Sequence, residues 1–268
     1  MHRMHTILGD GETKVGKSST TRAVVEAMPR DRLVRVADAG VFYRQLTAAT
    51  LDLLQVEDGS SVGAAHLDTA VQKTIASGVV YEGRDWGDLE RPAVARLVSE
   101  VGARSQAEGR RWYQQTALRA IKDGIDVLVL NGRNPRDRLA EAETGIPAAS
   151  VGVCLELIIK CDPEVAGLRA AIALYGPNPT AEQVTAQTAL VIKRRETDRN
   201  REDTPYIERP CSIISAPGVS IASVLEASWD APCGDAPRPI SFDTSYVPIA
   251  LMNQHVQELA RTALSLVE

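Results

Sequence analysis

The chain has 268 residues, 44% of them hydrophobic and 24% charged, which is the composition of a globular protein with one good core rather than of a disordered chain. Its formal net charge of −5 argues against a broad, non-specific grip on nucleic acid. The four cysteines form no CxxC pair, which argues against a zinc site, and no apolar run reaches the roughly 18 residues of a membrane span. Together these features favour a soluble, cytoplasmic protein that does not enter membranes.

The first predicted element is a short apolar strand at residues 5–8 (HTIL), and glycine follows it at once. Residues 11–18 (GETKVGKS) satisfy the pattern G-x-x-x-x-G-K-[ST], which is typical of a loop that binds nucleotide phosphates. Glycines let successive backbone N–H groups turn inward toward phosphate oxygens. Residues 19–28 (STTRAVVEAM) predict the helix whose positive end adds to such an anion site.

This loop pattern predicts that the chain binds a nucleotide together with Mg²⁺. Lys17 would reach the β- and γ-phosphates, and the hydroxyl of Ser18 would bind the magnesium ion. The residues expected to hold the nucleotide are Gly11, Glu12, Thr13, Lys14, Val15, Gly16, Lys17, Ser18 and Ser19.

Beyond the loop, stretches that predict strands alternate with stretches that predict helices. The expected strands are residues 33–37, 127–130, 154–159 and 240–242. The expected helices are residues 41–54, 93–121 with glycine joints at 102 and 109, 164–174, 182–199 and 248–266, whereas residues 55–92 are mixed. With the first strand, this alternation predicts an α/β fold with a parallel sheet of about five strands, sandwiched by helices. Cys154 and Cys161, in or beside an apolar run, are expected to be buried thiols.

Ligands of such sheets gather at the carboxyl ends of the strands. Asp38, Arg133 and Asp162 each follow directly after a predicted strand, so we expect them near the ligand. The helix at 182–199 becomes sharply basic at its end, where Arg194 and Arg201 flank Asp198. Guanidinium groups in this pattern suit the charge that spreads over a phosphate during transfer, although an exposed basic helix end favoured by the helix dipole is the alternative.

Four motifs in this order resemble the cytidylate kinase group of P-loop nucleoside monophosphate kinases. The loop at residues 7–18 is followed by Asp38-Ala39-Gly40-Val41-Phe42-Tyr43-Arg44, which resembles the family's Asp-x-Gly-x-x-Tyr-Arg. Gly132-Arg133-Asn134 resembles its Gly-Arg-Asp. The lid pattern R-x-x-x-D-x-x-R-x-x-x-P is matched by Arg194, Asp198, Arg201 and Pro205. The resemblance implies a single P-loop NTPase domain over residues 1–268, with an acceptor-binding helical region at 55–125 and a lid at 193–206.

The resemblance also implies a reaction, the transfer of the γ-phosphate of ATP to a pyrimidine nucleoside monophosphate. No covalent enzyme intermediate is expected, because positioning and charge neutralisation suffice for this chemistry. The implied catalytic residues are Lys17, Asp38, Arg194, Asp198 and Arg201. The implied acceptor-binding residues are Asp38, Tyr43, Arg44, Arg91, Arg133 and Asn134.

The sequence departs from the family at several points. Asn134 replaces an aspartate, Ala39 replaces a small hydroxyl residue, and the base-reading segment is not recognisable in residues 78–92. Residues 207–238 form an insertion that is atypical of the family, within which a small strand and helix are expected, either as an extra edge element or as part of a different acceptor pocket. These departures keep open a hydroxyl acceptor on a modified nucleoside, a small metabolite or, less favoured, a base within DNA. A third hypothesis is a regulatory protein that binds ATP without turnover.

Overall fold

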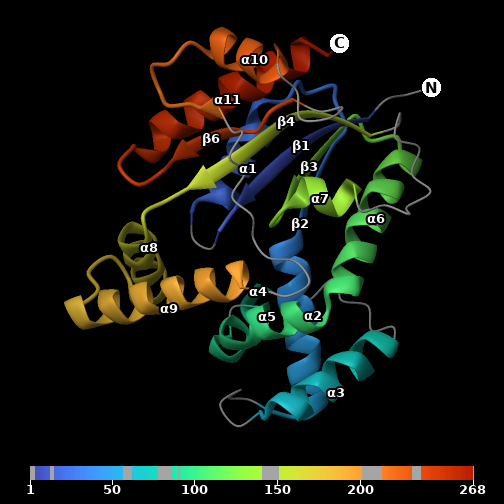
Figure 1. Ribbon diagram of the computed structural model, residues 1–268, viewed down its shortest axis with the longest axis vertical. Coiled ribbons are helices and arrows are strands. Elements are labelled where there is room, and N and C mark those ends of the chain that lie inside the picture. Colours follow the sequence, from blue (N-terminus) through green and yellow to red (C-terminus); the bar gives the residue numbers. More distant parts are fainter. Residues whose placement is uncertain are drawn as a thin grey trace.

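The computed structural model describes residues 4–12, 15–56, 62–77, 86–89, 91–140, 151–200, 213–230 and 237–267. Within these residues, six strands form one sheet in the order β2-β3-β1-β4-β6-β5, and every neighbouring pair is parallel (Figure 1). The strands are β1 (Met4–Gly11), β2 (Val34–Asp38), β3 (Val127–Asn131), β4 (Val151–Lys160), β5 (Ile213–Ile214) and β6 (Ile240–Asp243).

The central strand β1 pairs with β3 on one side and with β4 on the other. The strand order therefore reverses at β1, and in sheets of this kind the crevice outside the carboxyl ends at the reversal is where ligands bind. Because β1 ends at Gly11, the sheet places the glycine-containing loop at this crevice.

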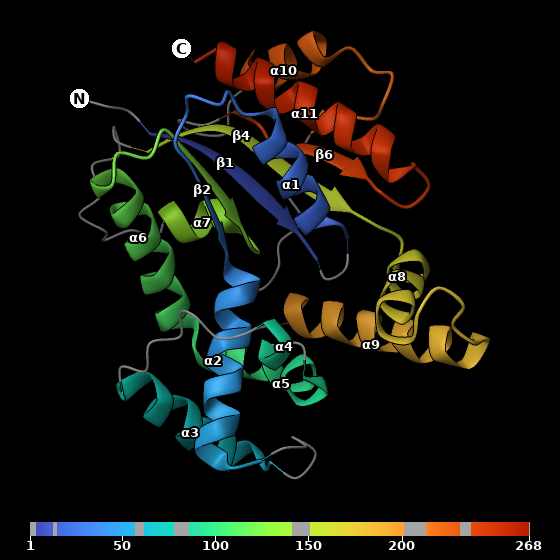
Figure 2. The same cartoon turned by 180° about the vertical axis from the view of Figure 1, so that it is seen from behind.

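Helices cover both faces of the sheet (Figures 1 and 2). On one face, Ile7 of β1 belongs to a core formed with α1 (Lys17–Ala27), α10 (Ile221–Asp230) and α11 (Ile249–Ser265). On the other face, Leu8 packs with α6 (Gln106–Lys122), beside α7 (Pro135–Ala140). Successive residues of a strand point to opposite faces, so a strand covered on both faces needs an uninterrupted apolar sequence.

A separate helical region lies beyond the carboxyl edge of the sheet. It consists of α2 (Ala39–Leu54), α3 (Ala64–Ala76), α4 (Trp86–Leu89) and α5 (Pro92–Arg104), which share their own apolar core. Asp38 connects this region to the sheet: it is the last residue of β2, and its carboxylate accepts a hydrogen bond from the Gly40 N–H at the start of α2.

A pair of helices, α8 (Pro163–Tyr175) and α9 (Ala181–Arg199), follows β4 and lies at the same edge (Figure 1). Asp162 caps α8, and Thr180 and Gln183 form a capping box at the start of α9. The two helices approach closely at Gly167, where an added Cβ would lie 2.0 Å from the Thr188 hydroxyl oxygen. The pair is therefore a well-packed unit that extends from the end of β4.

The predicted alternation of strands and helices is confirmed, and the structure differs from the prediction in three details. The sheet has six strands rather than about five, because Ile213–Ile214 pairs with β6 and forms an edge strand. The helix expected at 93–121 is broken at Ser105 and not at its glycines. Gly109 instead allows close packing, since an added Cβ would lie 2.0 Å from the Tyr43 hydroxyl oxygen. Helices α3, α4 and α7 were not predicted.

The sequence also predicts the state of two cysteines and the secondary structure of the insertion. Cys154 and Cys161 are buried free thiols, as predicted. Within the insertion, the expected strand and helix are β5 and α10, and α10 packs against α11; residues 207–212 and 231–236 lie outside the described residues. Among the helices that the structure describes, none is long and apolar enough to cross a membrane.

A buried ion pair joins α7 to the sheet and gives a test of the fold. The Nε of Arg136 lies 2.7 Å from an oxygen of Glu156, whose side chain in β4 is fully buried. We expect Arg136→Met to lower the free energy of unfolding by about 3–5 kcal/mol, because it removes the cation that faces this buried carboxylate. Chemical denaturation measures the difference.

The matched control is Arg35→Met, which removes an arginine from an ion pair with Asp123 at the surface. The two groups lie 2.8 Å apart, but their side chains are 33% and 48% exposed, so the expected loss is below about 1 kcal/mol. A loss for Arg136→Met as small as that of the control would contradict the structural role assigned to the pair.

Candidate functional site

The loop between β1 and α1 depends on two glycines with left-handed backbone conformations. Gly11 has φ +143°, and an added Cβ would lie 2.5 Å from the carbonyl oxygen of Ile159 in β4. Gly16, with φ +106°, is the residue immediately before α1. Side chains disfavour both conformations, so glycine is required here. The loop is also fixed from β6, because the hydroxyl of Thr244 donates a 2.7 Å hydrogen bond to the carbonyl of Val15.

Lys17, the first residue of α1, folds back over this loop. Its ammonium group donates hydrogen bonds to the carbonyl oxygens of Gly11 and Glu12. Burial, and secondly the charge of Arg133, lower the pKa of Lys17 to about 8, although Asp38 and Asp10 act in the opposite direction. The loop therefore holds a cation whose charge an incoming anion would stabilise further.

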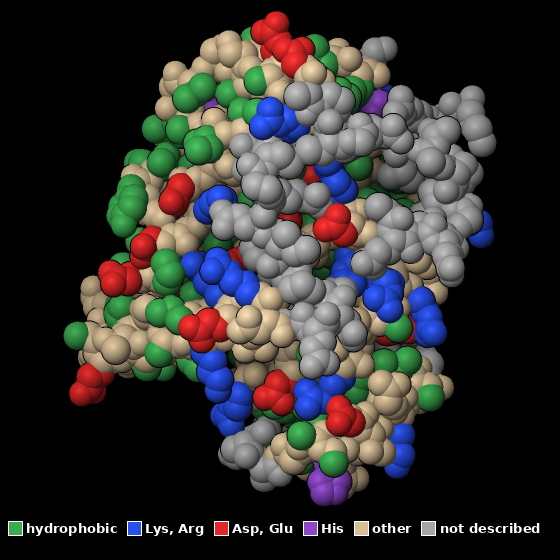
Figure 3. Space-filling model, in the orientation of Figure 1, with side chains coloured by type: hydrophobic (Ala, Val, Ile, Leu, Met, Phe, Trp, Pro, Cys, Tyr) green, Lys and Arg blue, Asp and Glu red, His purple; other side chains and the backbone are tan. Residues whose placement is uncertain are grey.

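A cleft of about 480 Å³ opens over the loop and extends toward the helical region. Among the described residues that line it, Asp38 is the sole carboxylate, whereas six side chains are cationic. The cations are Lys17, Arg44, Arg133, Arg138, Arg169 and Arg194. On the face shown in Figure 3, Lys and Arg side chains gather across the middle of the molecule, in line with this concentration of positive charge. In a protein of net charge −5, such a cleft is suited to a polyanion.

Most of the predicted site residues meet at this cleft. Its lining includes Val15, Gly16, Lys17, Ser18, Ser19, Asp38, Tyr43, Arg44, Arg133 and Arg194. Six other predicted residues are described but are not part of the lining: Gly11, Glu12, Arg91, Asn134, Asp162 and Asp198. The carboxylate of Asp162 instead caps α8 by accepting from the N–H of Glu164. Three more lie outside the described residues: Thr13, Lys14 and Arg201.

Asp198 lies behind the cleft rather than in it. Its carboxylate is 1% exposed and forms an ion pair with Arg133, which follows β3. Arg194 is one turn earlier on α9 and lines the cleft. The ion pair thus connects α9 to Arg133, just past the end of β3 and next to the loop.

Two predicted acceptor-binding residues do not line the cleft. Arg91 forms a 3.1 Å ion pair with Asp52 and donates to the carbonyl of Asp88, so it joins α2 to α4. Asn134 is buried with φ +49°, and its N–H donates to the carboxylate of Asp10. The roles predicted for these two residues in acceptor binding stay predictions.

Three polar side chains of the cleft were not predicted from the sequence: Tyr113, Arg138 and Arg169. The guanidinium of Arg138 is nearly buried and donates a 2.6 Å hydrogen bond to the side-chain oxygen of Gln106. Arg169 donates to the hydroxyl of Thr244, the residue that holds the loop. Burial raises the pKa of Tyr113 well above its usual value, so its phenol stays protonated.

A signal for the two arginines was present in the sequence. Both lie in the first two turns of helices that follow strands β3 and β4, and such turns begin at the carboxyl edge of the sheet. Tyr113 lies in the middle of α6, where an amphipathic pattern indicates only burial. Its position at the cleft depends on tertiary packing.

Comparison with known proteins gives little beyond this geometry. No protein-family model matches the sequence, and no curated protein matches it. The chain is similar to the crystal structure of a "putative kinase" from Chloroflexus aurantiacus J-10-fl, with 12% identity over 98% of this chain and 99% of that one, and a TM-score of 0.41. It is also similar to the crystal structure of TT1252 from Thermus thermophilus, with 17% identity over 75% of this chain and 86% of that one, and a TM-score of 0.31. TM-scores this low do not indicate a shared ligand or shared residue roles between these proteins and this chain.

The lowered pKa of Lys17 predicts how anion binding depends on pH. Well below pH 8 the ammonium is already charged, so the affinity for sulfate, an anion whose own charge is constant in this range, should be nearly independent of pH. The bound anion raises the pKa of Lys17, so above pH 8 binding requires the uptake of a proton. The affinity should therefore fall with rising pH, by up to about tenfold per pH unit. Isothermal titration calorimetry between pH 7 and 9.5 measures this. Lys17→Arg, which does not titrate in this range, should flatten the profile; a flat profile in the unchanged protein would contradict the assignment.

Proposed function

We propose that the protein is an ATP- and Mg²⁺-dependent phosphotransferase of the cytidylate kinase type, which moves the γ-phosphate to a pyrimidine nucleoside monophosphate. The observation that carries this proposal is the set of six cations around one cleft whose floor is the loop between β1 and α1. Two nucleotides that exchange a phosphoryl group bring several negative charges to one place, and guanidinium and ammonium groups stabilise them.

The donor would bind at the loop end of the cleft. Backbone N–H groups at the start of α1 can meet phosphate oxygens, and Lys17 can exchange its two carbonyl partners for them. Ser18 and Asp38 are the oxygen donors at the cleft that suit magnesium, which needs few protein ligands when phosphates and water supply the rest. When bound, the ion would neutralise charge on the β- and γ-phosphates.

The transfer itself is a displacement at the γ-phosphorus. A phosphate oxygen of the acceptor forms the new P–O bond, the bond to the bridging oxygen of ADP breaks, and the products are a nucleoside diphosphate and ADP. Arg194, together with the predicted Arg201, would stabilise the charge on the moving group. Arg44 and Arg133 would hold the acceptor's phosphate, and Asp38 would orient the acceptor.

A second candidate retains the donor and replaces the acceptor by a hydroxyl group. The observation that favours it is that Arg91 and Asn134, both expected to bind a nucleotide acceptor, do not line the cleft. A site that lacks its polar contacts to a base loses much of its discrimination for that base. A modified nucleoside, a small metabolite or a base within DNA would then receive the phosphate.

One experiment separates these functions. The protein is incubated with Mg²⁺ and ATP labelled at the γ-phosphate, against a panel of nucleoside monophosphates, modified nucleosides, DNA and small alcohols. Label on cytidine, deoxycytidine or another pyrimidine monophosphate is the result expected. Label only on a hydroxyl acceptor would favour the second candidate, and ATP binding without transfer would favour a regulatory protein that senses ATP.

The proposed roles of Lys17 and Arg194 predict the effect of removing them. Lys17→Ala and Arg194→Ala should each lower the rate of transfer by about 10²–10³-fold, because each removes a charge that is aimed at the reacting phosphates. The control is Arg22→Ala, which removes an exposed cation from α1 and should leave the rate unchanged. Circular dichroism verifies that all three variants fold; full activity in either of the first two would contradict the site assignment.

A further inference from the structure

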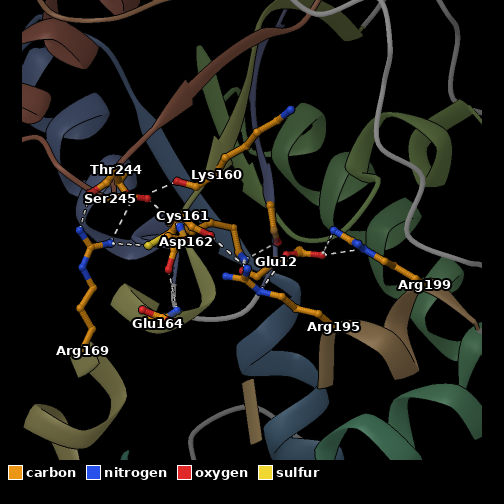
Figure 4. Close-up of polar contacts among 12 residues, drawn as sticks. Glu12, Lys160, Cys161, Asp162, Glu164, Arg169, Arg195, Arg199, Thr244 and Ser245 are labelled. Atoms are coloured by element: carbon orange, nitrogen blue, oxygen red, sulfur yellow. Dashed lines mark hydrogen bonds and ion pairs between the residues drawn. The ribbon is translucent and has the colours of Figure 1, made fainter. Parts of the chain in front are cut away.

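Glu12 is an acidic residue in a loop that is otherwise suited to anions. Its carboxylate is 10% exposed and turns toward α9, where it meets two guanidinium groups (Figure 4). The Nε of Arg195 lies 2.8 Å from one oxygen of the carboxylate, and Arg199 contacts the other at 3.0 and 3.1 Å. The loop and α9 are thus joined directly, although Glu12 and Arg195 are 183 positions apart in the sequence.

The two arginines occupy one face of α9, because residues four apart in a helix lie one above the other. Arg194 and Asp198 are also four apart and lie on the neighbouring face. That second face carries the residues that matter for the cleft, since Arg194 lines it and Asp198 holds Arg133. When Arg195 and Arg199 bind Glu12, the helix cannot rotate about its axis. The direction in which Arg194 and Asp198 point is therefore fixed as well.

The contact with Arg195 is the stronger of the two. Its side chain is 9% exposed, and it also donates a 3.0 Å hydrogen bond to the carbonyl of Cys161, just past the end of β4. Arg195 therefore joins the ends of the two central strands, β1 and β4, to the same turn of α9. Arg199 is 55% exposed, so water and salt screen its contribution.

We propose that Glu12 is a positioning residue for phosphoryl transfer: through Arg195 and Arg199 it holds α9 in the rotation that presents Arg194 to the cleft. The catalytic part of this proposal rests on the proposed function, whereas the positioning itself does not. The arrangement also explains how a phosphate loop tolerates an acid, because two guanidinium groups neutralise the carboxylate on the side away from the cleft lining.

The positioning is tested without any substrate by hydrogen–deuterium exchange of the amides at residues 191–200. Glu12→Gln keeps the shape of the side chain and removes its charge, so exchange in this segment should become about tenfold faster or more. Arg199→Gln removes the more exposed of the two partners of Glu12, so it should also speed up exchange in this segment, but by less. Glu196→Gln makes the same chemical change on an exposed position of α9 and should have no effect. Unchanged exchange in Glu12→Gln would overturn the proposal.

The catalytic consequence is tested by a double-mutant cycle in the transfer assay. Glu12→Gln should lower kcat by about 10–100-fold and change the KM for ATP much less, because the ground-state contacts of the loop remain. Arg194→Ala should then cost much less in the Glu12→Gln background than in the unchanged protein, since Arg194 is already misplaced. Fully additive effects would overturn the catalytic part. If the unchanged protein transfers no phosphate, the proposed function fails, and the exchange experiment alone decides the positioning.

Discussion

The mutual repulsion of six cations around one cleft is the constraint on which the rest of the site depends. Two unit charges 4 Å apart near a protein surface interact by about 4 kcal/mol, so such a group needs compensation from fixed anions or from a ligand. The described structure supplies part of it: Asp38 lines the cleft and Asp198 pairs with Arg133. A set of cations this large favours a ligand with several negative charges.

The parallel sheet brings these charges together from distant parts of the sequence. β1 delivers the loop, β2 ends in Asp38, β3 leads to Arg133, and β4 leads to α8 and α9. All of these strands end at the same edge because they are parallel. Glu12 then joins the first of these parts to the last, so α9 is held by the loop that follows β1.

The sequence was informative where local rules decide the structure. The glycine pattern at 11–18 and the apolar run at 127–130 located β1, its loop and β3, because these features depend on nearest neighbours along the chain. Arg138, Tyr113 and the contacts of Glu12 could not be found in this way. Arg138 is oriented by Gln106, which lies 32 residues away in sequence, and Glu12 by arginines more than 180 residues away. Such contacts arise from tertiary packing, which periodicity does not encode.

A crystal structure of the protein with a non-hydrolysable ATP analogue and Mg²⁺ tests the central claim most directly. We expect the β- and γ-phosphates to lie on the loop and Arg194 to face the γ-phosphate. The ammonium of Lys17 should have moved from the carbonyls of Gly11 and Glu12 to phosphate oxygens. A nucleotide bound elsewhere, or one whose phosphates leave Lys17 on its carbonyl partners, would contradict this claim.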